Sequence, residues 1–142
     1  MKKYLVVVLF LCILSLGCIG RFSLSDEYYG FSGINNVSGE SLSSLLNSNK
    51  SFMLYVYKAD SKACSSFREI LDDFSNEYSI KVISISYDEL QKIGLDKEIG
   101  VYPSLAFFKD GEFSSYVFIN SSDIKNTNDV YNLVGNYINL KK

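Results

Sequence analysis

The chain has 142 residues, enough for one domain and a short leader but not for two domains. Apolar residues make up 47% of it and the formal net charge is −2. This composition predicts a folded core and argues against a disordered chain and against a nucleic-acid-binding protein, which needs a basic surface. The sequence contains no His, which excludes His-ligated zinc and Cys-His or Ser-His catalytic pairs within the chain. We expect no metal and no cofactor.

The chain begins with a predicted export signal. Lys2 and Lys3 form a charged start, and an apolar run follows from Tyr4 to Leu16. This run is shorter than the roughly 20 residues of a membrane-spanning helix. Loss of residues 1–17 would remove two basic residues and no acid, which makes the remaining chain more acidic.

The end of this segment, Ser15-Leu16-Gly17-Cys18, resembles the lipobox of bacterial lipoproteins. The resemblance implies that residues 1–17 are removed and that Cys18 carries lipid, although Ser15 and Leu16 depart from the usual residues at their positions. Cleavage near Gly20 and an uncleaved anchor are the alternatives. All three place the domain outside the cytoplasm, anchored to a membrane in the first and third cases.

Residues 18–31 mix polar and apolar residues without periodicity and are predicted to be a tether, followed by a domain over 32–142. Ser38 and either Asp60 or Ser61 are candidate helix caps. Apolar periodicity and the turn signal Asp110-Gly111 predict the elements in this order: strand 33–37, a short helix after Ser38, strand 51–57, a helix from about 61 to 78, strand 81–86, helix 88–93, strands 104–108 and 113–119, and helix 127–140.

The apolar run from Ser51 to Tyr57 is typical of a central strand buried on both faces. Strands that alternate with helices pair in parallel, and the closing hairpin adds antiparallel strands. The fold class is therefore predicted to be α/β, with a mixed sheet of four to five strands between helices.

Two segments carry a resemblance to the thioredoxin family. The segment from Leu54 to Tyr78 resembles the active-site strand, turn and helix of thioredoxins, and Ile70-Leu71-Asp72 matches a landmark of that helix. The segment from Gly100 to Glu112 is similar to the region with the family's cis-proline and final hairpin, with Pro103 as the only proline of the chain. The resemblance implies a thioredoxin-like fold and a substrate groove formed by Lys62, Ala63, Tyr102 and Pro103.

The redox centre departs from the family's pattern. In the gapless alignment the family's Cys-x-x-Cys falls on Ser61-Lys62-Ala63-Cys64, so that a serine occupies the nucleophile position and Cys64 the resolving position. Thiol–disulfide exchange needs a thiolate to attack and a second thiol to resolve the mixed disulfide. The family's buried acid falls on Tyr55. Ordinary dithiol oxidoreductase activity is therefore not expected.

Cys64 is the one cysteine left after Cys12 leaves with the signal and Cys18 is lipidated, so an internal disulfide is excluded. With a three-residue insertion in the turn, Cys64 would instead be a nucleophile at the helix start. It is also a candidate for a small buried residue without chemistry.

Three functions compete at this point, and the sequence favours the first. The first is a degenerate redox protein that acts through Cys64 on thiol-containing polypeptides or other envelope proteins. The second is a non-catalytic binding or chaperone-like lipoprotein that uses the groove near Ser61 and Pro103. The third is a scaffold.

Overall fold

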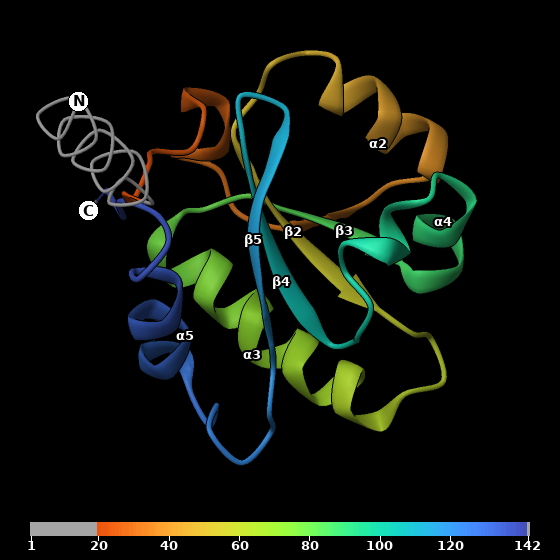
Figure 1. Ribbon diagram of the computed structural model, residues 1–142. Helices are drawn as coiled ribbons and strands as arrows, with labels where there is room; N and C mark the ends of the chain where they lie inside the picture. Colours follow the sequence, from red (N-terminus) through yellow and green to blue (C-terminus); the bar gives the residue numbers. More distant parts are fainter. Residues whose placement is uncertain (1–19, 142) are drawn as a thin grey trace, which may run out of the picture.

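The structure is a computed structural model that describes residues 20–141, in which a five-stranded sheet has the order β1-β3-β2-β4-β5 (Figure 1). The predicted signal peptide over 1–17 and the predicted lipidation site at Cys18 lie outside the described residues. The strands are β1 Ile34–Asn36, β2 Phe52–Tyr57, β3 Val82–Ser86, β4 Ser104–Lys109 and β5 Glu112–Phe118. β1, β3 and β2 are parallel, while β4 and β5 are antiparallel to their neighbours. The mixed α/β sheet predicted from the sequence is confirmed.

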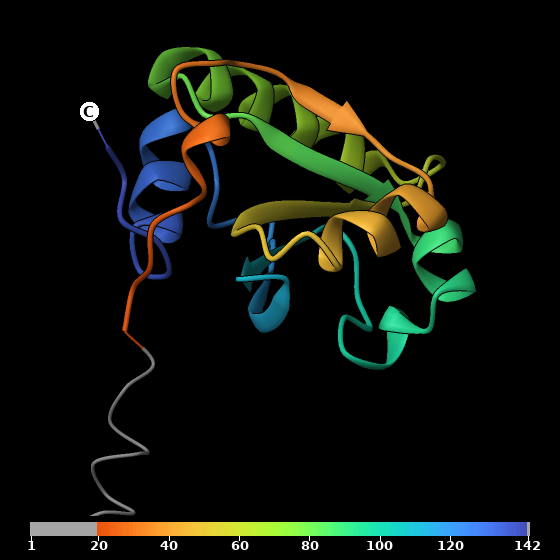
Figure 2. The same cartoon turned by 90° about the horizontal axis from the view of Figure 1, so that it is seen from above.

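Helices cover both faces of the sheet (Figures 1 and 2). They are α2 Gly39–Leu46, α3 Lys62–Tyr78, α4 Tyr87–Lys92 and α5 Thr127–Val134, with short 3-10 turns at Asp26–Tyr28 and Leu95–Lys97. α3 packs against α5, and α2 against α4. Within residues 20–141, no helix is both long enough and apolar enough to span a bilayer.

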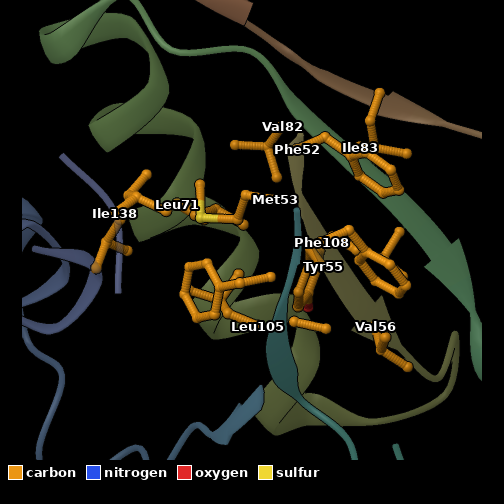
Figure 3. Packing of buried hydrophobic residues seen from close by; sticks show 14 of the residues in the cluster. Phe52, Met53, Tyr55, Val56, Leu71, Val82, Ile83, Leu105, Phe108 and Ile138 are labelled. Atoms are coloured by element: carbon orange, nitrogen blue, oxygen red, sulfur yellow. The ribbon is translucent and has the colours of Figure 1, made fainter. Parts of the chain in front are cut away.

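β2 forms the centre of the core, as its apolar run predicts. Its side chains alternate between the two faces of the sheet. Phe52 stacks on Phe108 of β4 with ring centroids 4.8 Å apart (Figure 3). Tyr55 meets Phe67 of α3 edge-on at 5.5 Å. Because β2 lies between β3 and β4, its end is held in a fixed place from which the chain enters the turn before α3.

The β4–β5 hairpin turns at Asp110-Gly111, as expected. Both residues have positive φ, 53° and 80°, the combination that a two-residue hairpin turn of type I′ requires. A side chain at Gly111 would collide with the carbonyl oxygen of Leu46, and the Gly111 N–H donates to the Lys50 carbonyl at 2.8 Å. The turn therefore docks the hairpin onto the segment that follows α2.

The N-terminal segment differs from the predicted tether. Phe22, Leu24 and Tyr28 are buried in the core. The Phe22 N–H donates to the Tyr137 carbonyl at 3.4 Å, and the Asn139 N–H donates to the Phe22 carbonyl at 2.8 Å. The structure thus packs residues 22–29 against the domain, because their irregularly spaced apolar side chains join the core, where the Tyr28 ring lies 6.3 Å from that of Phe52.

The last helix is also shorter than expected. α5 ends at Val134, and Ile138 forms a parallel bridge with Phe22 in place of a further helical turn. Ile138 is nevertheless buried and Tyr137 stacks on Phe107 at 4.5 Å, so the apolar residues of the predicted stripe face the core as expected. Pairing with Phe22 gives hydrogen-bond partners to the Tyr137 carbonyl and the Asn139 N–H, which a longer helix would have bonded internally.

Candidate functional site

The start of α3 is fixed by a serine cap. Ser61 has extended backbone angles, and its Oγ accepts a hydrogen bond from the Cys64 N–H at 3.3 Å. The Ser61 carbonyl accepts the first helical bond from Ser65 at 3.1 Å. The helix begins at Lys62, so Cys64 is its third residue and not its first. This geometry matches the gapless alignment, and the register that places Cys64 at the helix start does not fit it.

Cys64 is 2% exposed, and it is the one cysteine between residues 20 and 141. Its Sγ lies 3.4 Å from the backbone nitrogen of Lys58, whose N–H donates to the sulfur. The thiol therefore lies beneath the turn that joins β2 to α3, and the backbone of that turn covers it.

Tyr55 lies directly under this turn and is fully buried. Its hydroxyl donates to the carbonyl oxygen of Cys64 at 2.7 Å. Burial, and next the proximity of Cys64, raise the pKa of the Tyr55 hydroxyl above its ordinary value. The hydroxyl stays protonated at neutral pH and acts as a donor to the helix, so Tyr55 cannot serve as a proton acceptor in place of the family's acid.

Three segments meet around the start of α3. Val56 of β2 pairs with Ser104, which places Pro103 at the same end of the sheet as the turn over 58–61. The Tyr102–Pro103 peptide bond is cis, and the Pro103 carbonyl accepts a hydrogen bond from the Ile119 N–H at 2.9 Å. Val101 and Tyr102 project large apolar surfaces into solvent, and Tyr102 is 37% exposed.

Two hollows flank the first turns of α3. The first, here called the Ile119 hollow, has a volume of about 210 Å³ and is lined by Ala63, Ser66, Phe67, Ile70, Ile119, Ser121, Ile124 and Lys125. The second, here called the Arg68 hollow, has a volume of about 230 Å³ and is lined by Tyr55, Tyr57, Lys58, Ala59, Cys64, Ser65 and Arg68. The first hollow is apolar at its base, whereas the second carries two cationic side chains.

The two basic side chains of the Arg68 hollow, Lys58 and Arg68, each contact a neighbouring side chain. The guanidinium of Arg68 lies 5.8 Å from the centroid of the Tyr57 ring. Lys58 forms an ion pair with Asp88 at 2.7 Å, and the hydrogen bond to that carboxylate raises the pKa of Lys58. With two basic side chains in its lining, this hollow favours anionic groups.

The predicted site residues lie at one end of the molecule. Ser61, Lys62, Ala63 and Cys64 form the first turn of α3, and Tyr102 and Pro103 lie at the same end of the sheet. Lys62 lines neither hollow, whereas Ala63 and Cys64 each line one.

Sequence reasoning missed Arg68, Ile119 and Ile124. Arg68 follows Cys64 by four residues on the same helix, a spacing that places the two side chains on one face and that could have identified it. Ile119 and Ile124 lie far from α3 in the sequence and carry no comparable signal. Within the described chain, no three Cys, Asp or Glu side chains gather as a metal site.

Comparison with known proteins agrees with this architecture. The family described as TraF, F plasmid transfer operon protein, matches residues 36–105. A search of curated protein sequences gave no match.

Solved thioredoxin structures are similar in fold. The thioredoxin NaTrxh from Nicotiana alata is 16% identical with a TM-score of 0.59 over 77% of this chain and 96% of that one. The oxidised thioredoxin from Plasmodium falciparum is 16% identical with a TM-score of 0.57 over 72% and 96% of the two chains. A mutant thioredoxin from Halobacterium salinarum is 20% identical with a TM-score of 0.56 over 77% and 94%.

Proposed function

Because this chain is a thioredoxin-like protein in its fold, we propose that it is an exported, membrane-anchored binding protein that holds polypeptide at the start of α3 without dithiol catalysis. One observation carries this proposal: the nucleophile position is occupied by Ser61, which is engaged as a helix cap, while the remaining thiol of Cys64 is 2% exposed. A serine hydroxyl does not exchange with disulfides.

The surroundings of Cys64 support the absence of a catalytic cycle. Exchange requires the thiol to lose a proton and the sulfur to reach a substrate disulfide. The Tyr55 hydroxyl, with its raised pKa, is a donor and takes no proton. The backbone of Lys58 covers the sulfur.

The surface around the start of α3 supports polypeptide binding. The ring of Tyr102 packs against Tyr87 of α4 with centroids 5.1 Å apart, and the residue remains 37% exposed. It offers an apolar area with a polar tip, which is typical of binding surfaces. The Ile119 hollow, beside Ala63 and Phe67, has the volume for an apolar side chain. A bound segment would place one side chain in the hollow and pack along Tyr102.

The leader supports export and anchoring. The charged start, the apolar run from Tyr4 to Leu16 and the cysteine after Gly17 together favour a lipoprotein signal. Lipid on Cys18 would hold the domain at the extracytoplasmic face of a membrane, where the partners would be other envelope proteins.

A second candidate function is single-thiol exchange, favoured by the Arg68 hollow. This hollow reaches Cys64 and is lined by two basic side chains, Lys58 and Arg68. In that function the Cys64 thiolate would attack a partner's disulfide, form a mixed disulfide and release the partner's other sulfur as a thiolate.

One experiment separates the two candidates. The full chain, purified from membranes in detergent, is tested for retention of a reduced and carboxymethylated polypeptide, which has no free thiol. We expect retention by the wild type and by Cys64→Ser, and binding at least about fivefold weaker for Tyr102→Asp, since a charge replaces a buried contact. Tyr116→Asp is the matched control, because Tyr116 is 39% exposed and lies on β5 outside both hollows.

Equal binding by wild type and Tyr102→Asp would overturn the binding proposal. If the wild type forms mixed disulfides with a disulfide-containing polypeptide and Cys64→Ser does not, the second candidate is correct. In a disulfide-reduction assay, we expect no turnover from either protein.

A further inference from the structure

The end of the domain opposite the candidate site is built from both ends of the described chain. In Figures 1 and 2, the first described residues and the C-terminal segment lie together beside the end of α3, and the turn before Ser61 lies at the other side of the molecule. The bridge between Tyr29 and Ile80 and that between Phe22 and Ile138 fix this arrangement. The 17 residues of α3 separate the two ends by about 25 Å.

The distance from Cys18 to the packed domain is short. Phe22 is buried and hydrogen bonded to Tyr137 and Asn139, so the chain is fixed to the domain from that residue on. Four residues span at most about 14 Å in any conformation. A lipid on Cys18 would therefore hold this end of the domain at the membrane surface, whereas the 14-residue tether predicted from the sequence would have allowed free rotation.

The surface at this end has the chemistry of a membrane interface. We name it the terminal pole and define it by Tyr29, Phe31, Tyr78, Tyr131 and Lys141. Phe31 is 64% exposed, the most exposed large apolar side chain of the described residues. Phe31 follows Gly30, which lines a hollow together with the half-buried Tyr29 and Tyr78, and the ring of Tyr78 lies 4.7 Å from that of the half-buried Tyr131. Aromatic side chains with a polar tip are enriched where lipid headgroups meet water.

The terminal pole is also hollowed and carries charges of both signs. A hollow of about 450 Å³ is lined by Tyr29, Gly30, Glu77, Tyr78, Ser79 and Lys141. The Lys141 ammonium lies 4.4 Å from the Tyr29 ring centroid and pairs with Asp26 at 3.1 Å. Aromatic rings and a carboxylate around a hollow suit the cationic part of a headgroup, and lysine suits the phosphate.

From these observations we infer that the terminal pole docks on the phospholipid headgroup layer and that the domain presents the start of α3 away from the membrane. This inference rests on the anchor at Cys18 that is part of the proposed function. The binding surface around Tyr102 and the Ile119 hollow would then face outward, where it is open to polypeptides from the surrounding compartment.

The test compares two cysteine variants on the same helix. Glu77→Cys lies at the terminal pole and Lys62→Cys at the start of α3, and both parent residues are exposed. Each full chain is labelled in intact membranes and in detergent with a maleimide that carries a bulky polyethylene glycol chain. The buried Cys64 and the lipidated Cys18 contribute little, and the wild type measures that background.

We expect the label to react with Glu77→Cys at least about fivefold more slowly in membranes than in detergent, because docking covers the pole, and with Lys62→Cys at one rate in both. Insertion of a flexible Gly/Ser linker between Gly20 and Arg21 should restore the rate of Glu77→Cys. Fatty-acid labelling of the wild type and of Cys18→Ser reports the anchor separately.

The outcomes are distinguishable. Fatty-acid label on the wild type together with unchanged maleimide rates for Glu77→Cys overturns the docking inference and leaves the anchor standing. The absence of lipid and of membrane association overturns the anchor and the inference with it.

Discussion

The two ends of α3 show how this molecule divides stability from binding. At the end of the helix, the fully buried Ser75 donates its hydroxyl to the Ile80 carbonyl and accepts the Gly33 N–H, both at 2.6 Å, while Gly30 bonds to Ser79. At the start, Ser61 makes one side-chain bond and two hollows remain open. The buried bonds at its end fix α3 in the fold, whereas the two hollows at its start leave open the surface on which we propose that polypeptide binds.

The largest expected effect is that of Leu24→Ala, which tests whether the N-terminal segment stabilises the domain near the end of α3. Leu24 is 2% exposed within the core, so Leu24→Ala should lower the free energy of unfolding by about 2–5 kcal/mol, through lost burial and the cavity left behind. Urea unfolding of the full chain in detergent measures this. Phe31→Ala is the control, expected to change stability by no more than about 0.5 kcal/mol, because Phe31 is exposed.

A loss as small as that of the control would show that residues 22–29 contribute little to the fold. The predicted tether over 18–31 would then describe the behaviour of the chain in solution.

Ser75 gives the next largest effect. Ser75→Ala removes both bonds and leaves the part-buried Gly33 N–H and the buried Ile80 carbonyl with one partner fewer, which should cost about 1–3 kcal/mol. Ser66→Ala on the exposed side of the same helix should change stability by no more than about 0.5 kcal/mol. Equal unfolding midpoints for the two variants would contradict the proposal that the bonds at the end of α3 contribute most to stability.

The same division explains how much the sequence could predict. The order of the elements and a cap at Asp60 or Ser61 follow from local patterns: period-2 and period-3.6 apolar spacing, and a capping residue placed before a helix. The resemblance to thioredoxins also placed Ser61 just before α3 and Cys64 in its first turn. These features depend on residues that are close together in the sequence, so they can be predicted from the sequence alone.

The missed features depend on contacts between distant segments. Phe22, Leu24 and Tyr28 follow no period, since they pack from an irregular segment, and nothing in their spacing indicates that the C-terminal residues pair with them. The Ile119 hollow likewise forms only when β5 and the segment after it come beside α3. Local patterns contain no information about such pairings.

A smaller effect is expected at the cap. Ser61→Ala removes the bond to the Cys64 N–H and should lower stability by about 1 kcal/mol, while Ser61→Asp should retain it, since aspartate also caps helices. Neither change should alter retention of the carboxymethylated polypeptide by more than about twofold, because in the proposed mode of binding Tyr102 and the Ile119 hollow make the contacts. Loss of binding in Ser61→Asp, with stability unchanged, would show that the Ser61 side chain itself contacts the ligand.

The smallest effect is expected for the unfolding free energy in alkaline solution, where two buried tyrosines are compared, one near each end of α3. Burial raises the pKa of Tyr28 to about 12, and burial also raises that of Tyr55. The unfolded chain releases these protons near pH 10, so the stability due to each raised pKa is fully present below pH 10 and is lost as the pH rises toward the folded-state value. Each group contributes at most about 1.4 kcal/mol per pH unit to this decline.

Tyr28→Phe and Tyr55→Phe should each make the unfolding free energy fall less steeply above pH 10, because phenylalanine does not titrate. The change should be larger for Tyr55→Phe, since Tyr55 is fully buried and its pKa is raised further, by Cys64 as well as by burial. Urea titrations at several pH values between 9 and 11 measure the slopes. A larger change in Tyr28→Phe would mean that water reaches the base of the Arg68 hollow in solution, and that Cys64 is more accessible than its position beneath the turn indicates.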